Sequence, residues 1–133
     1  MKSPRSAVLL SLVALLPIYG CGSKVDNATS EAAARSLVKA MIAGDSKAID
    51  SLSKSDASGW STSRVLEAAN NLKMVGTDIS DYEISDLGKN AFLVKNKKTG
   101  QPVIALLFIF ADGRYYFIRG DDKGESSGQL NAN

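Results

Sequence analysis

Apolar residues in the first half of the chain recur with the period of an amphipathic helix. Beyond residue 28, three stretches carry them three and four positions apart, on one side of a helix. The three predicted stripes are Ala34, Leu37, Val38, Met41 and Ile42; Ala48, Ile49 and Leu52; and Val65, Leu66, Ala69 and Leu72. Residues able to cap a helix N-terminus precede each stripe, namely Thr29 or Ser30, Asp45, and Thr62 or Ser63. Gly44 suits the end of the first helix, so the pattern predicts three helices.

In the second half of the chain the period changes to two, which is typical of β-strands. The alternating stretches are 82–87, 91–96, 103–110 and 114–119, with short separators rich in Gly, Asn and Asp. The last separator is Asp-Gly at positions 112–113, a strong signal for a two-residue hairpin turn. Helices followed by antiparallel strands predict an α+β fold, with N-terminal helices packed on a four-stranded antiparallel sheet.

The predicted turns also assign residues to the two faces of that sheet. The face expected to meet the helices is almost wholly apolar and aromatic: Phe92, Val94, Ile104, Leu106, Phe108, Phe110, Tyr115 and Phe117. The opposite face, called the outer face below, carries Leu93, Lys95, Val103, Ala105, Leu107, Ile109, Arg114, Tyr116 and Ile118. A sheet face in contact with water normally carries polar residues, and the outer face does so only in part.

Residues 1–20 have the layout of a bacterial export signal. Lys2 and Arg5 precede the apolar run 7–16, which Pro17 ends. A run of this length suits the central segment of a signal peptide. It is too short for a stable transmembrane helix, which needs about 20 apolar residues. A short transmembrane helix, or an ordinary signal followed by a chance cysteine, is the alternative.

The junction Ile18-Tyr19-Gly20-Cys21 resembles the bacterial lipobox. The resemblance implies cleavage before Cys21, a thioether-linked diacylglycerol on its sulfur, and an acyl chain on the new amine, which together anchor a protein stably. Gly22 follows the cysteine, and the resemblance then favours the outer membrane's periplasmic leaflet, or the outer face of a single membrane. The predicted layout is a signal (1–20), a lipidated tether (21–28), a folded domain (29–120) and a disordered tail (121–133).

Composition removes several classes of function. Outside the signal, 14 Lys and Arg balance 14 Asp and Glu, and no basic stripe is present. Nucleic acid is therefore not an expected partner, because phosphate backbones require clustered positive charge. The chain has no histidine, which removes the commonest general base and most zinc sites. We expect no cofactor and no metal site.

Two segments of the domain resemble a known family. The first helix with its Ala43-Gly44-Asp45 break, and the closing strand 112–118 (DGRYYFI), are similar to a domain of unknown function in small bacterial lipoproteins. That domain belongs to the cystatin-like, nuclear-transport-factor-2-like superfamily. The resemblance implies a curved sheet wrapped round a long helix as a cone, sometimes with a pocket inside, and it implies no single activity.

Candidate catalytic groups on such a cone are carboxylates near the first strand, Asp78, Asp81 and Asp86, with Tyr82 or Tyr115 as a donor. Their spacing selects no pair, so we assign no catalytic residue; surface turn acids are the favoured interpretation. Trp60 is either a hydrophobic staple on the third helix or an anchor at the cone mouth, and the staple is favoured.

The outer face offers the best candidate for an interaction surface. Leu107, Ile109, Tyr116 and Ile118 would form a contiguous apolar patch, larger than monomers normally expose. Alternatively, the tether, the tail or the 53–60 loop covers this patch. Dimers of the superfamily that the domain resembles commonly use this face, and this favours a homodimer or an envelope protein partner. The leading hypothesis is a non-enzymatic, membrane-anchored binding module of the cell envelope. A small-ligand carrier or acid/base enzyme that uses the cone interior is the alternative, and a purely structural lipoprotein is a third.

Overall fold

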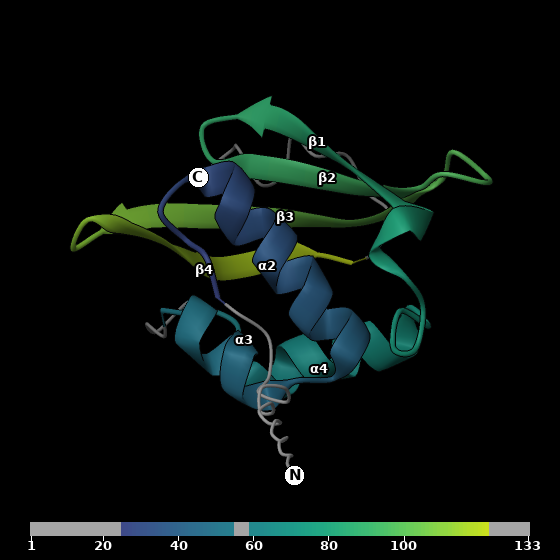
Figure 1. Cartoon of the computed structure of the whole chain (residues 1–133), viewed down its shortest axis with the longest axis horizontal. Helices are drawn as coiled ribbons and strands as arrows, with labels where there is room; N and C mark the ends of the chain where they lie inside the picture. The colour runs from purple at the N-terminus through teal and green to yellow at the C-terminus, as the bar shows by residue number, and fades with distance from the viewer. Residues whose placement is uncertain (1–24, 55–58, 123–133) are drawn as a thin grey trace, which may run out of the picture.

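The structure, a computed structural model, describes residues 25–54 and 59–122. It confirms the α+β class, with helices that precede an antiparallel sheet (Figure 1). The helices are α2 (Ser30–Ala43), α3 (Ser46–Leu52) and α4 (Thr62–Asn71), and a 3₁₀ turn, η2 (Ile79–Asp81), follows them. The strands are β1 (Tyr82–Gly88), β2 (Ala91–Asn96), β3 (Pro102–Ala111) and β4 (Arg114–Asp121).

Most predicted helix ends are confirmed, because they depend on local capping. The Thr29 side chain accepts a hydrogen bond from the Ala32 N–H at 3.1 Å and begins α2. Gly44 ends α2 in the left-handed region, with φ 63°, and Asp45 caps α3. The prediction for α4 was wrong by one residue: its cap is Ser61, whose hydroxyl accepts from the Arg64 N–H.

The sheet is a simple meander in the order β1-β2-β3-β4, with every neighbouring pair antiparallel. The predicted register is confirmed in all four pairs: Val94 with Ile104, Phe92 with Leu106, Phe108 with Phe117, and Phe110 with Tyr115. Asp112 and Gly113 both have positive φ, 54° and 80°, as a two-residue hairpin turn requires.

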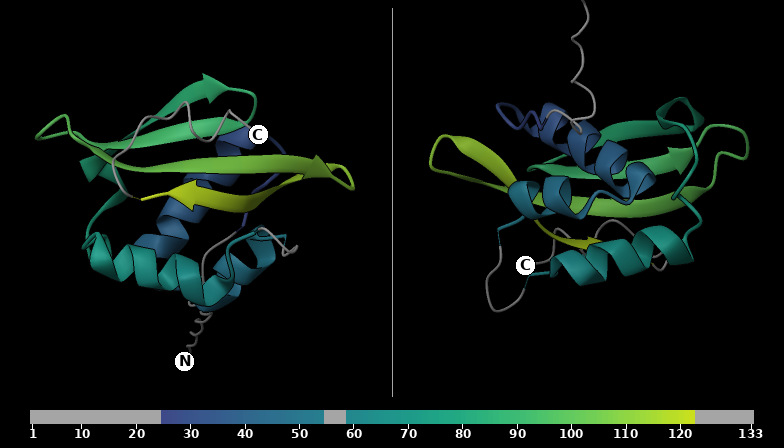
Figure 2. Two further views of the ribbon diagram at one scale, coloured as in Figure 1. Left: turned by 180° about the vertical axis from the view of Figure 1, so that it is seen from behind. Right: turned by 60° about the horizontal axis from the view of Figure 1, so that its bottom comes forward.

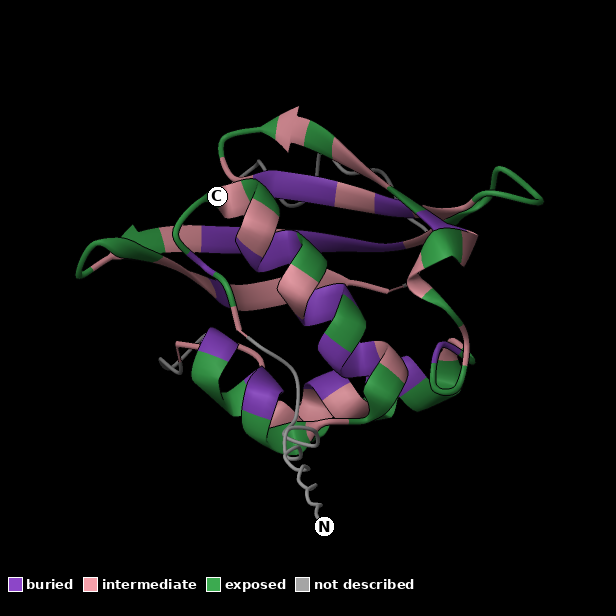
Figure 3. Ribbon diagram, in the orientation of Figure 1, coloured by how far each residue is buried: buried purple, intermediate pink, exposed green. Residues whose placement is uncertain are grey.

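The helices lie on one side of the sheet. Helix α2 crosses the face diagonally, whereas α3 and α4 lie beside β4 (Figures 1 and 2). The largest buried side chains come from both layers: Phe92, Phe108, Phe117, Leu37, Met41, Ile49 and Leu52. The expectation that Phe110 meets the helices was wrong, because β3 extends beyond them and leaves this side chain 59% exposed. Figure 3 shows the buried middle of β2 and β3 and the exposed hairpin tips.

Both ends of the domain lie beyond the predicted boundaries. In the expected tether, Val25 packs against the core and Asn27 is buried. Tyr115 N–H donates to the Asn27 carbonyl, and the Asn27 amide donates back to the Tyr115 carbonyl, both at 3.0 Å. Strand β4 continues through Asp121, the first residue of the expected tail. Residues 123–133 of the tail, and all of the signal with Cys21, lie outside the described residues.

Candidate functional site

The predicted interaction residues of the outer face lie together on β3 and β4. Ile109 pairs directly with Tyr116, and Leu107 lies two positions along the same face from Ile109. All four side chains of the patch are half-buried. No helix that the structure describes covers this face, as the view from behind shows (Figure 2). The patch is therefore a continuous apolar strip along the β3–β4 pair.

A β-bulge, which the sequence pattern did not reveal, shapes one end of this strip. Phe108 pairs with Phe117, but Leu107 pairs with Arg119, so Ile118 and Arg119 both lie opposite Leu107. An extra residue of this kind bends its strand and increases the local twist. Beyond the bulge, Arg119 and Asp121 pair with outer-face residues of β3, so charged residues border the apolar strip there.

Tyr116 is partly covered by a cation from the helical layer. The Lys54 ammonium lies 5.1 Å from the centre of the Tyr116 ring, a distance suited to a cation–π contact. The same ammonium pairs with the Asp112 carboxylate at 3.2 Å, with the Lys54 side chain partly exposed and the Asp112 side chain largely exposed. Part of the Tyr116 ring therefore faces the Lys54 ammonium.

Trp60 stands directly before the α4 cap, the position of a hydrophobic staple, and it also closes the β4 edge. The backbone N–H of Trp60 donates to the Ile118 carbonyl at 2.6 Å. Its ring meets the Phe117 ring edge-on, with centres 5.9 Å apart, and the Arg64 guanidinium lies 4.0 Å from its centre. Arg64 in turn holds Asp122 through two hydrogen bonds of 3.0 and 3.1 Å. Trp60 is thus a packing residue of the domain, and only part of it reaches solvent.

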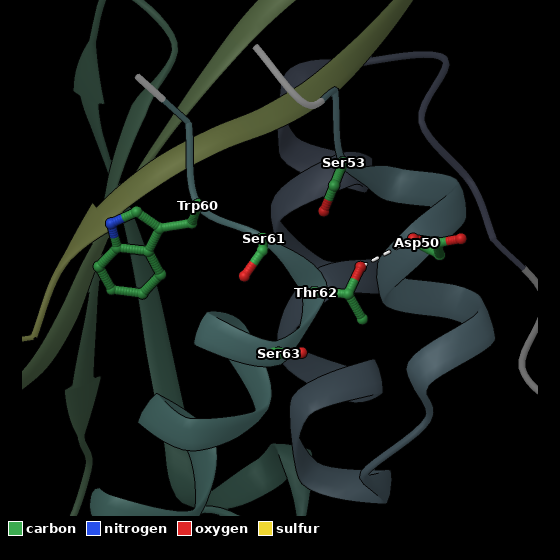
Figure 4. A pocket seen from close by; sticks show the side chains of 6 residues that line it. All are labelled: Asp50, Ser53, Trp60, Ser61, Thr62 and Ser63. Atoms are coloured by element: carbon green, nitrogen blue, oxygen red, sulfur yellow. Dashed lines mark hydrogen bonds between the residues drawn. The ribbon is translucent and has the colours of Figure 1, made fainter. Parts of the chain in front are cut away.

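A hollow of about 320 Å³ lies next to Trp60, between the end of α3 and the start of α4. Its lining is mostly hydroxyl groups: Asp50, Ser53, Trp60, Ser61, Thr62 and Ser63 (Figure 4). The hydroxyls of Ser53, Ser61 and Thr62 are each engaged locally, with the Ile49 carbonyl, the Arg64 N–H and the Asp50 carboxylate. The Trp60 ring points away from the other five side chains (Figure 4). These hydrogen bonds stabilise the junction between α3 and α4, and they occupy the hydroxyls of Ser53, Ser61 and Thr62.

A second hollow, of about 230 Å³, lies where α2 crosses β1 and β2. Ile84 and Phe92 supply its apolar part, and Glu31 and Arg35 of α2 supply its charged part. This is where the mouth of a cone would open. Phe92 is nevertheless almost fully buried, and its ring meets the Phe108 ring edge-on with the two ring centres 6.0 Å apart. Packed side chains therefore fill the space behind Phe92.

The candidate carboxylates near β1 lie at the surface and support turns. Asp78 accepts from the Ser80 N–H at 2.9 Å, and the Asp81 carboxylate accepts from the Asp78 N–H. Hydrogen bonds from the backbone and side chain of Ser80 hold the pKa of Asp78 below its usual value. Asp86 accepts from the Gly88 N–H at 2.7 Å in the β1–β2 turn. Asn27 is the only polar residue among those described that is buried as a whole, although one carboxylate oxygen of Asp121, at the end of β4, is also shielded from solvent.

The two candidate tyrosine donors lie apart from each other and have structural partners. The Tyr82 hydroxyl lies 2.9 Å from the Thr77 hydroxyl, at the start of β1. Tyr115 lies at the start of β4, where its ring packs against the Phe110 ring with the two ring centres 4.9 Å apart. The structure therefore brings no acid and tyrosine pair together around a common cavity.

Comparison with known proteins gives no relative: no family model, no curated protein and no solved structure matches the chain. The resemblance to the cystatin-like family therefore stays a prediction. Within residues 25–54 and 59–122, no helix has the length and apolar character needed to cross a membrane. The same residues contain no cluster of three or more potential metal ligands.

Proposed function

We propose that this protein is a non-enzymatic binding module of the bacterial cell envelope, anchored by lipid on Cys21. The anchor rests on the apolar run 7–16 and the lipobox-like junction before Cys21. The binding role rests on one observation: helices cover one face of the sheet, whereas no described helix covers the apolar strip on the other. The recognition surface of this proposal is Leu107, Ile109, Tyr116 and Ile118, with a second copy or an envelope protein as partner.

The carrier or enzyme alternative has less support. Acid/base chemistry on this fold would need a carboxylate inside the helix–sheet layer, where burial raises its pKa. The described carboxylates near β1 are instead turn and cap residues, and hydrogen bonds from Ser80 hold the pKa of Asp78 below its usual value rather than above it. The interior between α2 and the sheet is filled by aromatic and aliphatic side chains.

Sedimentation at several concentrations tests the recognition surface, with a soluble form that begins at Gly22. We expect a dimer that Leu107→Lys converts to a folded monomer, because a charge in the strip opposes its burial. Val75→Lys is the matched control, since Val75 is an exposed apolar residue that packs beside Gly44, away from the strip. Equal effects of the two substitutions would contradict a role for the strip in self-association.

If the wild-type domain is a monomer, chemical crosslinking in intact envelopes separates a partner from no partner. A crosslinked product lost with Leu107→Lys and kept with Val75→Lys would assign the strip to another protein. The same product pattern in all three proteins would overturn the proposed binding role. Loss of fatty-acid labelling in Cys21→Ala, with labelling of the wild type, tests the anchor separately.

A further inference from the structure

The β3–β4 hairpin tip carries an exposed aromatic side chain that the fold itself does not use. Phe110 is 59% exposed and is the only exposed aromatic residue in the part of the chain that the structure describes. Its ring packs on the half-buried Tyr115 ring at 4.9 Å, and the tip extends beyond the helices (Figure 1). Exposure of so large an apolar side chain to water is unfavourable, so a surface that covers Phe110 would stabilise the protein.

The start of the described chain is tied to this same tip. The Asn27 backbone and side chain exchange two hydrogen bonds with the Tyr115 backbone, and the Arg114 guanidinium donates to the Asn27 side-chain oxygen at 3.2 Å. Asp26 is held to α2, because its carbonyl accepts from the Ser36 hydroxyl and its N–H donates to the Ser36 oxygen. The chain is therefore fixed to the domain from Asp26 onward, beside Tyr115 and Phe110.

The short distance along the chain places the proposed anchor near the tip. Cys21 precedes Asn27 by six residues, and six extended residues span at most about 22 Å. A lipid on Cys21 would hold the Asn27 side of the domain within that distance of the bilayer surface. Of the two exposed large apolar residues described, Phe110 lies on this side, and Val75 lies at the far end of α2, beside Gly44.

We propose that the hairpin tip, formed by Phe110, Tyr115 and Arg114, is a second membrane contact that inserts into the headgroup layer of the bilayer holding the Cys21 lipid. This proposal rests on the lipid anchor of the proposed function. Aromatic rings favour the membrane–water boundary, where one part is apolar and another meets water. The exposed Arg114 suits lipid phosphates, and its guanidinium retains donors beyond the one that meets Asn27. The contact would fix the orientation of the domain and hold the outer-face strip at a set angle to the membrane.

A fluorescent label at the tip tests the contact in the full lipidated protein. The chain has one cysteine, Cys21, and its sulfur is blocked by the lipid, so Phe110→Cys adds a single reactive thiol. The variant is labelled with an environment-sensitive nitrobenzoxadiazole group and placed in vesicles of phosphatidylethanolamine and phosphatidylglycerol. We expect emission to rise several-fold on vesicle binding, and nitroxide groups on the lipid chains to quench it. Val75→Cys with the same label is the matched control, for which we expect neither change.

The outcomes separate the two proposals. Flotation with the vesicles and the mass of the acylated residue at Cys21 report the anchor independently of the label. An acylated protein that floats but shows no emission change or quenching at position 110 would overturn the membrane contact and leave the anchor intact. Equal quenching at positions 110 and 75 would also overturn it, because the domain would then have no preferred orientation. A wild-type protein without acyl groups on Cys21 would overturn both proposals.

Discussion

The two edges of the sheet are stabilised in different ways. At the β4 edge, residues distant in sequence cover the strand: the N–H groups of Lys54 and Trp60 donate to the carbonyls of Phe117 and Ile118. Asn27 bonds to the start of the same strand, and the Trp60 ring packs over Gly120. Exposed strand edges favour unwanted pairing with other chains, and here the Lys54 and Trp60 segments and Asn27 occupy the edge.

At the β1 edge, no described segment pairs with the free edge of the strand, and the turns on either side of it are held by local hydrogen bonds. Asp78 and Asp81 cap the η2 turn before it, and Asp86 fixes the turn after it. Glu83 is exposed on the strand itself, and charge on an edge strand discourages pairing with another chain. The β4 edge thus depends on tertiary packing and the β1 edge on turn chemistry, and this difference predicts unequal sensitivity to substitution.

The largest expected difference is between Phe117→Ala at the β4 edge and Ile84→Ala at the β1 edge. Phe117 is fully buried against Trp60 and Phe108, so its truncation leaves a cavity that costs roughly 3–5 kcal/mol of unfolding free energy. Ile84 is only half-buried, and we expect its truncation to cost about 1 kcal/mol. Urea denaturation of both variants measures the two losses, and equal losses would contradict the contrast between the edges.

The next effect concerns the close approach of Trp60 to β4. A β-carbon at Gly120 would lie 2.8 Å from the Ala105 carbonyl oxygen and 3.3 Å from the Trp60 ring. We expect Gly120→Ala to cost roughly 1–3 kcal/mol, because the backbone contact can be relieved only by shifting a strand. The same substitution in a Trp60→Leu background shows which contact matters. Persistence of the loss there assigns it to the Ala105 carbonyl, whereas its disappearance assigns it to the ring. A stabilised Gly120→Ala variant would show that the edge is looser than described.

The contribution of Arg64 and Asp122, which close the same edge, is expected to be smaller. Their two hydrogen bonds of 3.0 and 3.1 Å join a partly exposed guanidinium to a carboxylate, and such pairs contribute about 1 kcal/mol. A double-mutant cycle with Arg64→Ala and Asp122→Ala measures the coupling, which should decrease at high salt. Arg64→Ala should cost more than Asp122→Ala, because the guanidinium also lies over the Trp60 ring. Additive single effects would mean that the pair does not hold the edge.

The contrast between the edges also explains which parts of the fold could be predicted from the sequence. The caps at Thr29 and Asp45 and the turn at 112–113 are local, since each needs only a suitable residue beside a change of period. The β3–β4 register next to the turn followed from it and from the alternating pattern. In β2–β3 the predicted pairs are also present, but the ladder shifts by one residue between Val94 and Lys95, next to the connecting loop. The cap of α4 was displaced because residues 61–63 are all able to cap, and tertiary contacts at Trp60 decide among them.

The candidate site was less predictable, because its shape depends on contacts between distant residues. Alternation placed Leu107 and Ile109 on the outer face, but one extra residue at Ile118 leaves no mark in an apolar run, so the bulge was missed. Alternation also assigns Phe110 to the helix side without showing how far the helices extend. Asn27 lies in a polar stretch without periodicity, and only the structure shows that it is buried against β4.

The smallest expected effect lies at the β1 edge and depends on pH. Hydrogen bonds from Ser80 favour the charged form of Asp78, so its pKa is lower in the folded than in the unfolded chain. Its stabilising contribution is therefore present above the ordinary aspartate pKa of about 3.9 and is lost as the pH falls through the lower folded value. Asp78→Asn keeps a capping side chain but does not titrate. We expect the wild type to be slightly more stable than this variant at neutral pH, and the difference to vanish in strong acid.

Urea denaturation at neutral pH and at about pH 2 measures that difference in stability. The lower pH lies below the ordinary pKa of aspartate. Glu67→Gln is the control, an exposed carboxylate within α4, where the charge is far from the η2 turn. A difference between wild type and Asp78→Asn that is independent of pH would mean that the cap acts through shape alone. If Asp78→Asn instead lost as much stability at neutral pH as Phe117→Ala, the β1 edge would depend on its turn as strongly as the β4 edge depends on Phe117. The contrast between the two edges would then be wrong.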